Sequence, residues 1–497
     1  MLLRTRRDFI RQAACAAVGS VAISNTLRDF RFINSALAQA SDPFADYKAL
    51  VCVFLSGGND SNNFIIPRGS DWTTYQAARQ NLAIPEASLV NISPDNNDGH
   101  SYGFHPNCPE LGTLFGEGKL GILFNAGPLL YPTTRDQYQK KSVALPPQLF
   151  SHSDQVTHWQ TSLPDKPAET GWAGRVAREL FLDMTSAQRT NMQISLCTSI
   201  AGANTFETAD TFGITLPQGE DATNISKLKQ YHVSTSGAVT LSGVVTGRKA
   251  TMLNIARLTQ TNLQERAYGD VMDRAIVLGD TLNTAIAPTV DTGTTPPWTW
   301  TTAFPNTSLG TQLKMVARLI AARNALGMKR QIFFVTVGGY DTHTSQIGGN
   351  NSDPLTGSHA NLLNELSEAV FAFQRGVEQV GAHSTLGSPT LVGSVAGFTA
   401  SDFGRTLPTN GQGSDHGWGS HHIMFGGAVR GKRTYGSFPV LSVGGPNDTS
   451  TGRWIPTTSV DEYSATMAKW FGVSATDLPT VFPNLSRFNN PDLGFMH

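Results

Sequence analysis

Three aspartates follow directly after short apolar segments of the chain. In chain order they are Asp60 after 49–55, Asp341 after 331–337 and Asp402 after 390–399. Continuous apolar runs of this length are typical of strands buried on both faces of a sheet. Ligands of open α/β sheets bind beyond the carboxyl ends of the strands, so we expect the three carboxylates in one cleft. There they could ligate a divalent metal or act as acid–base groups, although an aspartate beside glycine also makes turns and helix caps.

A histidine accompanies the second of these aspartates. His343 stands two residues after Asp341 in the loop 338–343, which begins with two glycines. Residues two apart in an extended segment face the same way. A carboxylate and an imidazole on one face suit zinc, manganese or a similar divalent ion.

The glycine-rich segment 411–422 contributes a second carboxylate–imidazole pair, Asp415 and His416, followed by His421 and His422. The alternative is that the first pair makes only a turn hydrogen bond. Because side chains alternate along a strand, at most one of His421 and His422 should face a site, and we assign His421 to it. The sequence thus predicts one or two divalent ions held by Asp60, Asp341, His343, Asp402, Asp415, His416 and His421.

Two serines and one arginine could act on a substrate. Ser151 and Ser153 flank His152 in a segment that continues with Asp154. A hydroxyl beside histidine and aspartate suggests a nucleophile, but serine is also among the commonest helix N-caps. Arg405, in the loop after 390–399, could hold an anionic substrate with its planar guanidinium or pair with a strand-end aspartate.

The elements that must position these residues follow an alternating order. A fourth apolar run lies at 120–124, and helical patterns occupy 169–184, 250–283, 311–326, 359–380 and 460–471. Strands alternating with helices predict a layered α/β fold with a mostly parallel central sheet and helices on both faces. We expect one domain over residues 41–497, with insertions near 199–246 and 287–308.

The N-terminal segment has the order of an export signal. Arg6 and Arg7 precede a weakly apolar run at 13–23, and small residues at 36–40 offer cleavage sites. The paired arginines predict a twin-arginine signal over residues 1–40 and recognition by the twin-arginine translocase. The run is too short for a spanning helix, so we expect a periplasmic or secreted mature protein without a membrane span.

Composition narrows the range of partners. The chain has 37 basic and 38 acidic side chains, a net charge of −1, and no basic stripe, which argues against nucleic acid as a partner. Cys52, Cys108 and Cys197 are an odd number without metal-type spacing, and the apolar surroundings of Cys52 favour a buried thiol.

Several motifs together resemble the secreted bacterial family called domain of unknown function 1501. They are the segments 54–60, 149–155, 338–343, 401–406 and 415–419, together with Arg6 and Arg7, and they span nearly the whole mature chain. At fold level that family is placed with alkaline phosphatases and sulfatases. The resemblance therefore implies an alkaline-phosphatase-like fold that holds one or two divalent metals with aspartate and histidine.

The resemblance also implies roles for individual residues. Asp60 would match the first-strand metal aspartate, and Asp341 with His343 the aspartate–histidine pair of one metal. Asp402 would match the aspartate of a later pair, and His416 the last metal histidine.

This sequence departs from the phosphatase pattern in three respects. Phe403 follows Asp402 where phosphatases place a histidine, so a second metal would lack one ligand. The spacing from Asp341 to His343 is tighter than in phosphatases. The sulfatase string Cys-x-Pro-x-Arg does not occur, which argues against a sulfatase nucleophile.

These patterns together predict an exported, divalent-metal-dependent hydrolase of phosphate-type or sulfate esters. Its substrate would be an anionic ester or glycan. The alternative is a non-catalytic metal- or glycan-binding protein of the cell envelope on the same fold.

Overall fold

The computed structural model describes residues 44–96, 98–237, 246–258, 261–289 and 299–497. The chain divides into two compact units, Met1–Asp46 and Tyr47–His497, and the second carries the elements described below. The predicted signal peptide, residues 1–40, lies outside the described residues.

Three parallel strands form the centre of the sheet. They are β1 (Lys48–Leu55), with β8 (Arg330–Val337) on one side and β9 (Val395–Ser401) on the other. Leu55 at the end of β1 lies opposite both Val337 and Ser401, so the three carboxyl ends are level. After its first residue β1 is buried throughout, which explains its continuous apolar sequence. β9 starts later than predicted, because residues 392–394 form a 3-10 turn.

The full sheet has nine strands in the order β11-β5-β10-β9-β1-β8-β6-β7, with β12 paired to β5. The added strands are β5 (Leu120–Gly127), β6 (Cys197–Ser199), β7 (Tyr231–His232), β10 (Ser420–Phe425), β11 (Thr434–Tyr435) and β12 (Thr458–Ser459). β10 runs antiparallel to β5 and β9, whereas the other recorded pairings in this sheet are parallel. A second sheet contains β2 (Ile65–Pro67), β4 (Tyr102–Phe104) and β3 (Val90–Ile92). The predicted α/β class with a mostly parallel sheet is confirmed.

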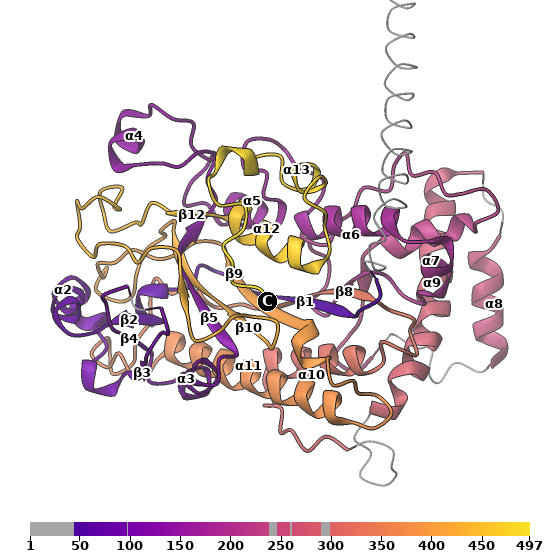
Figure 1. The fold of residues 1–497 in the computed structure, drawn as a ribbon, viewed down its shortest axis with the longest axis horizontal. Coiled ribbons are helices and arrows are strands. Elements are labelled where there is room, and N and C mark those ends of the chain that lie inside the picture. The colour runs from indigo at the N-terminus through magenta and orange to yellow at the C-terminus, as the bar shows by residue number, and fades with distance from the viewer. Residues whose placement is uncertain (1–43, 97, 238–245, 259–260, 290–298) are drawn as a thin grey trace, which may run out of the picture. The chain divides into compact units, whose positions relative to one another are not determined.

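Helices cover both faces of the large sheet. In Figure 1, α5 (His152–Thr161), α6 (Trp172–Asp183) and α12 (Val460–Phe471) lie on one side, and α3 (Pro109–Gly116), α10 (Ser308–Ala321) and α11 (Ser358–Ala382) on the other. The remaining helices are α2 (Ser70–Arg79), α4 (Arg135–Lys140), α7 (Ser186–Asn191), α8 (Thr246–Ala256), α9 (Leu263–Ile286) and α13 (Leu478–Val481). The helix predicted at 250–283 is thus two helices. α12 has the predicted bounds, because Ser459 and Glu462 form a capping box at its start.

Part of the segment 199–246 extends the sheet, since it contains β7, which pairs with β6. Cys52, Cys108 and Cys197 are buried free thiols. Among the described residues, no helix combines the length and the apolar character needed to cross a bilayer.

Candidate metal centre

The carboxyl ends of the three central strands are joined by direct hydrogen bonds. The backbone N–H of Ser56 donates to the carbonyl oxygen of Val337 at 2.9 Å, and the N–H of Gly57 donates to Oδ1 of Asp402 at 2.9 Å. Gly57 has a φ of +118°, and a Cβ there would lie 2.4 Å from the backbone nitrogen of Asp341. Only glycine allows this approach, so the glycine after β1 brings the loops after β8 and β9 together.

A short backbone ladder brings the glycine-rich loop to the same place. The N–H of Gly404 donates to the carbonyl of Trp418 at 3.0 Å, and the N–H of Thr406 donates to the carbonyl of Asp415 at 2.9 Å. Arg405 and His416 are bridge partners in this ladder. The Asp415–His416 pair therefore lies beside the end of β9.

Within the described residues, one group of three side chains could hold a metal ion: His152, Asp341 and His416. One ligand atom from each lies within 4.8 Å of the other two. The two Nε2 atoms are 3.1 Å apart; that of His152 lies 3.4 Å from Oδ2 of Asp341, and that of His416 lies 3.4 Å from Oδ1. Ligands bound tetrahedrally at about 2.0–2.1 Å from zinc are separated by about 3.3 Å. The two imidazole nitrogens, each with the nearer carboxylate oxygen, thus have separations close to those of a tetrahedral ligand set.

Both histidines of this cluster are oriented by acceptors on their Nδ1 atoms. Nδ1 of His152 lies 2.7 Å from Oδ2 of Asp402, and Nδ1 of His416 lies 2.7 Å from the carbonyl oxygen of Phe150. A carbonyl can only accept, so Nδ1 of His416 carries the proton, and the carboxylate favours the same tautomer for His152. In their neutral forms the two rings then direct Nε2 lone pairs at each other and at a carboxylate. Such an arrangement is stable when a cation lies between them.

An uncommon backbone conformation of Phe150 directs its carbonyl oxygen toward Nδ1 of His416. Phe150 has a φ of +72°, in the left-handed region that side-chain-bearing residues rarely adopt. Strained backbone of this kind persists where surrounding contacts fix it, commonly at functional sites.

His343 and Asp415 form a second imidazole–carboxylate pair at the edge of the cluster. Nδ1 of His343 lies 3.1 Å from Asp415 Oδ1, and Nε2 lies 3.2 Å from Asp341 Oδ1. The side chain of His343 is 40% exposed, so this ring can meet solvent and a substrate. Both ring nitrogens of His343 thus face a carboxylate oxygen.

Together, burial and the neighbouring charges favour the protonation states of Asp341 and His416 that bind a cation. Burial would raise the pKa of Asp341, but the hydrogen bond and charge of Arg405, with neighbouring histidines, lower it below its usual value. Burial lowers the pKa of His416; the hydrogen bond to Phe150 opposes this effect, and the charges of His152 and Arg405 add to it. Asp341 is therefore ionised and His416 neutral near neutral pH, which are the forms that bind metals.

The structure places Asp402 behind His152, where it orients the ring, and Arg405 behind Asp341. Nη1 of Arg405 donates to Asp341 Oδ1 at 2.6 Å and to the Gly57 carbonyl at 3.2 Å, and Nη2 donates to the carbonyl of Ser414. The Arg405 side chain is fully buried. Of the two roles considered for it, the structure has the pairing with a strand-end aspartate.

Asp60 is not a member of this group; it forms a buried ion pair with Arg79 and also accepts a hydrogen bond from Gln346. Burial would raise the pKa of Asp60, but the charges of Arg79 and His359 and these hydrogen bonds lower it. Arg79 also donates to the carbonyl oxygen of Thr406 at 3.0 Å. The Asp60–Arg79 pair therefore braces the loop that carries Arg405.

His421 and His422 are both buried in the core. Nδ1 of His421 accepts from the backbone N–H of Asn125 at 3.1 Å, and the ring of His422 lies 4.7 Å from that of Trp159. They do alternate, but β10 is buried along its whole length, so neither side chain reaches the cleft. Burial lowers the pKa of each to about 3 and keeps both rings neutral.

The two candidate nucleophiles bond to a neighbouring carboxylate. Ser151 occupies the N-cap position of α5, but its Oγ donates to Asp154 at 2.6 Å instead of capping the helix. Ser153 Oγ donates to the same carboxylate at 3.2 Å. His152, which stands between the two serines, is the residue of this segment that enters the cluster.

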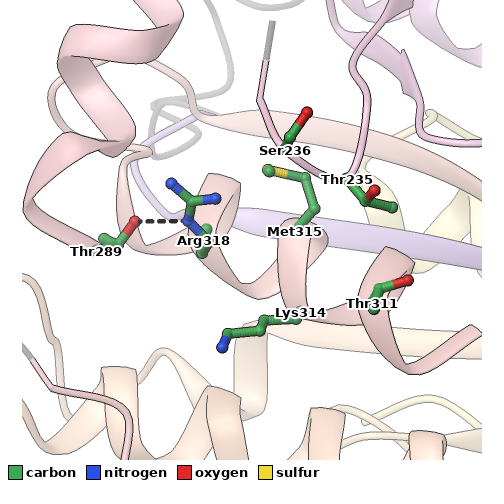
Figure 2. Close-up of a pocket in the computed structure, with 7 residues that line it drawn as sticks. All are labelled: Thr235, Ser236, Thr289, Thr311, Lys314, Met315 and Arg318. Atoms are coloured by element: carbon green, nitrogen blue, oxygen red, sulfur yellow. Dashed lines mark hydrogen bonds between the residues drawn. The ribbon is translucent and has the colours of Figure 1, made fainter. Parts of the chain in front are cut away.

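A separate cavity of about 290 Å³ lies along α10, lined by Thr235, Ser236, Thr289, Thr311, Lys314, Met315 and Arg318. Figure 2 shows the hydrogen bond that one lining residue, Arg318, donates to another, Thr289. Among the described residues, its lining offers cations and hydroxyls but no carboxylate or imidazole, so these side chains do not form a metal-ligand set.

The fold and the cluster define an α/β protein with a potential metal centre at the carboxyl edge of its sheet. The chain belongs to the family described as protein of unknown function (DUF1501), whose model matches residues 47–478. No curated protein matches the chain.

His152 is the cluster member that sequence reasoning did not assign to the metal. It begins helix α5 and therefore follows no apolar strand, which was the signal used for the aspartates. Its inclusion in the motif 149–155 was the available indication.

Proposed function

We propose that this protein is a divalent-metal-dependent hydrolase of phosphate-type esters, with the metal held by His152, Asp341 and His416. The observation that carries the proposal is the convergence of two Nε2 atoms, 3.1 Å apart, on one carboxylate while both Nδ1 atoms face acceptors. Around the cluster, Asp341, Asp402 and Asp415 outnumber the two arginines beside it, Arg405 and Arg453, so the site attracts positive charge.

The position of the cluster agrees with an alkaline-phosphatase-like arrangement, which we propose for the fold. Strand-end loops of β1, β8 and β9 meet there, and ligands of open α/β sheets bind at that edge. The match to a family of unknown function carries no activity of its own.

A divalent ion in this site would polarise an ester oxygen and acidify a water molecule. His152 and His416 supply neutral imidazoles held in the correct tautomer by Asp402 and Phe150. His343, exposed and paired with Asp415, can donate a proton to a leaving group or take one from water. Ser151 and Ser153 both donate to Asp154, whereas a water bound to the metal would lie at the cluster itself, so we propose water as the nucleophile.

The test measures zinc and manganese in protein purified after native export, together with hydrolysis of p-nitrophenyl phosphate and its diester. His152→Ala and His416→Ala should each lose most of the bound metal and the activity, and His343→Ala should keep the metal and lose activity. His100→Ala is the matched control, since His100 also pairs with an aspartate, Asp71, but at the surface. Metal retained by both cluster variants would refute the site.

One observation favours the alternative function, a metal- or glycan-binding envelope protein without turnover. The ring of Phe403 packs 4.7 Å from that of His152 and 4.6 Å from that of His416, where phosphatases place a further metal histidine. A second ion would lack that ligand. Bound metal without hydrolysis of either ester would support this binder.

A further inference from the structure

Arg453 lies directly against the residues that position His416. Its Nε donates to the carbonyl oxygen of His416 at 2.7 Å, and its guanidinium carbon lies 4.3 Å from the ring centroid of Phe150. The carbonyl of Phe150 is the acceptor that holds Nδ1 of His416. Arg453 is therefore next to the metal cluster. Its guanidinium group is held at the Nε edge by the hydrogen bond to His416 and on one face by the ring of Phe150.

The loop that carries Arg453 is itself held by a single carboxylate oxygen. Oδ1 of Asp448 accepts from the backbone N–H groups of Ser450 at 3.1 Å, Gly452 at 2.8 Å and Arg453 at 2.9 Å. Gly452 in turn accepts a hydrogen bond from the N–H of Leu407, close to Arg405. The loop is thus preorganised, which reduces the entropy that a ligand would have to overcome.

The two terminal nitrogens of Arg453, Nη1 and Nη2, have N–H groups available for a ligand. Within the parts of the chain that the structure describes, Nη1 and Nη2 of Arg453 donate to no protein acceptor, and the side chain is half-buried. Arg405 is the other arginine at the cluster, and both of its Nη nitrogens donate hydrogen bonds within the protein, to Asp341 and to backbone carbonyls. Arg487 also stacks on a ring, that of Tyr131, but its Nη2 pairs with Asp165.

We propose that Arg453 binds the anionic group of the substrate. Two parallel N–H donors in one plane match two terminal oxygens of a tetrahedral oxyanion, such as a phosphate or sulfate ester. Phe150 fixes the plane of the guanidinium, so the ester is oriented relative to the cluster. This inference rests on the proposed function and assigns its anion recognition to Arg453 in place of Arg405.

The test is calorimetric titration of zinc-loaded protein with inorganic phosphate and, separately, with sulfate. Arg453→Gln should weaken binding of both by about tenfold or more, because a charged bidentate contact is lost. Arg453→Lys should recover only part of it, since the charge remains but the planar fork does not. Zinc content, measured in the same preparations, should stay close to the wild-type value because no metal ligand is changed, and a melting temperature well above that of the titration shows that each variant is folded.

Two controls separate this role from general loss of positive charge. Arg487→Gln removes a ring-stacked arginine elsewhere and should not change phosphate binding. Lys314→Gln with Arg318→Gln removes the cations of the cavity in Figure 2 and should also leave it unchanged.

Phosphate that binds Arg453→Gln as tightly as wild type, or that is lost only in the cavity variant, overturns the inference. So does a wild-type protein that binds no phosphate or sulfate. If the protein takes up no metal, the proposed function fails, and the titration without zinc still tests Arg453. Binding that depends on Arg453 in the absence of metal would leave the inference standing.

Discussion

Replacing Asp402 with Asn should weaken metal binding although Asp402 is not one of the three ligands. Its carboxylate accepts twice, from Nδ1 of His152 at 2.7 Å and from the N–H of Gly57 at 2.9 Å. Asn has one oxygen for these two donors. If that oxygen keeps Gly57, its NH₂ group faces Nδ1 of His152, which must then accept, and the ring proton moves to Nε2.

That tautomer blocks the atom that should ligate the metal. Loss of such a supporting carboxylate typically costs about 10- to 100-fold in metal affinity, or about 1.4–2.8 kcal/mol. The assay is zinc affinity from competition with a chromophoric chelator at pH 7.5. The matched control is Asp415→Asn, which removes the partner of His343 and should leave zinc affinity within about threefold, because His343 lies outside the ligand set.

A folding defect would show as a lowered melting temperature of Asp402→Asn in the presence of excess zinc. If Asp402→Asn folds normally and binds zinc as tightly as wild type, the tautomer argument is refuted. Equal weakening in Asp415→Asn would instead make His343 a ligand.

Three further outcomes follow from the sequence and the burial of charges. Lysine at both Arg6 and Arg7 should hold full-length precursor in the cytoplasm, and normal appearance of the mature form outside would refute export by the twin-arginine route. Burial raises the pKa of Glu207 to about 8. The contribution of its protonated carboxyl group to stability is therefore fully present below about pH 4.5 and is lost as the pH rises to 8. Glu207→Gln should therefore raise the melting temperature at pH 8 by several degrees and change it little at pH 5, and equal shifts at both would contradict this. His421 and His422 have pKa values near 3, so their contribution to stability is complete above about pH 6.5 and falls toward pH 3. His422→Leu removes one of these contributions, so between pH 7 and 5 its melting temperature should fall less than that of wild type, or rise more, and an identical pH dependence would contradict this.

The centre of the fold could be predicted because its strands are buried on both faces. β1, β8 and β9 have continuous apolar sequences, and the glycines after β1 mark the close approach of the neighbouring loops. The predicted bounds of α12 agree with the structure, in which Ser459 and Glu462 form a capping box at its start. The break between α8 and α9 has no proline or glycine to mark it, so one helix was predicted there.

The site was harder to predict because its contacts join distant residues. Asp341 and His416 were assigned to the metal from their loops, and both are in the cluster. His152 reaches Asp402 across 250 positions of the chain, a contact that no local spacing reveals. Asp60 has the position of a ligand, but its use in an ion pair depends on Arg79, on helix α2.

The positions of the histidines of β10 likewise depend on residues that are distant in the sequence. Alternation correctly sends His421 and His422 to opposite faces. Whether a face is a cleft or core depends on the helices packed against it, here through Trp159 and Tyr463 around His422.

The most direct test of the metal centre is an anomalous difference map, collected at the zinc edge, from crystals of zinc-loaded protein. We predict one strong peak about 2.0–2.2 Å from Nε2 of His152, Nε2 of His416 and an oxygen of Asp341. No peak at this position, or a peak ligated by Asp60 or His421, would contradict the account.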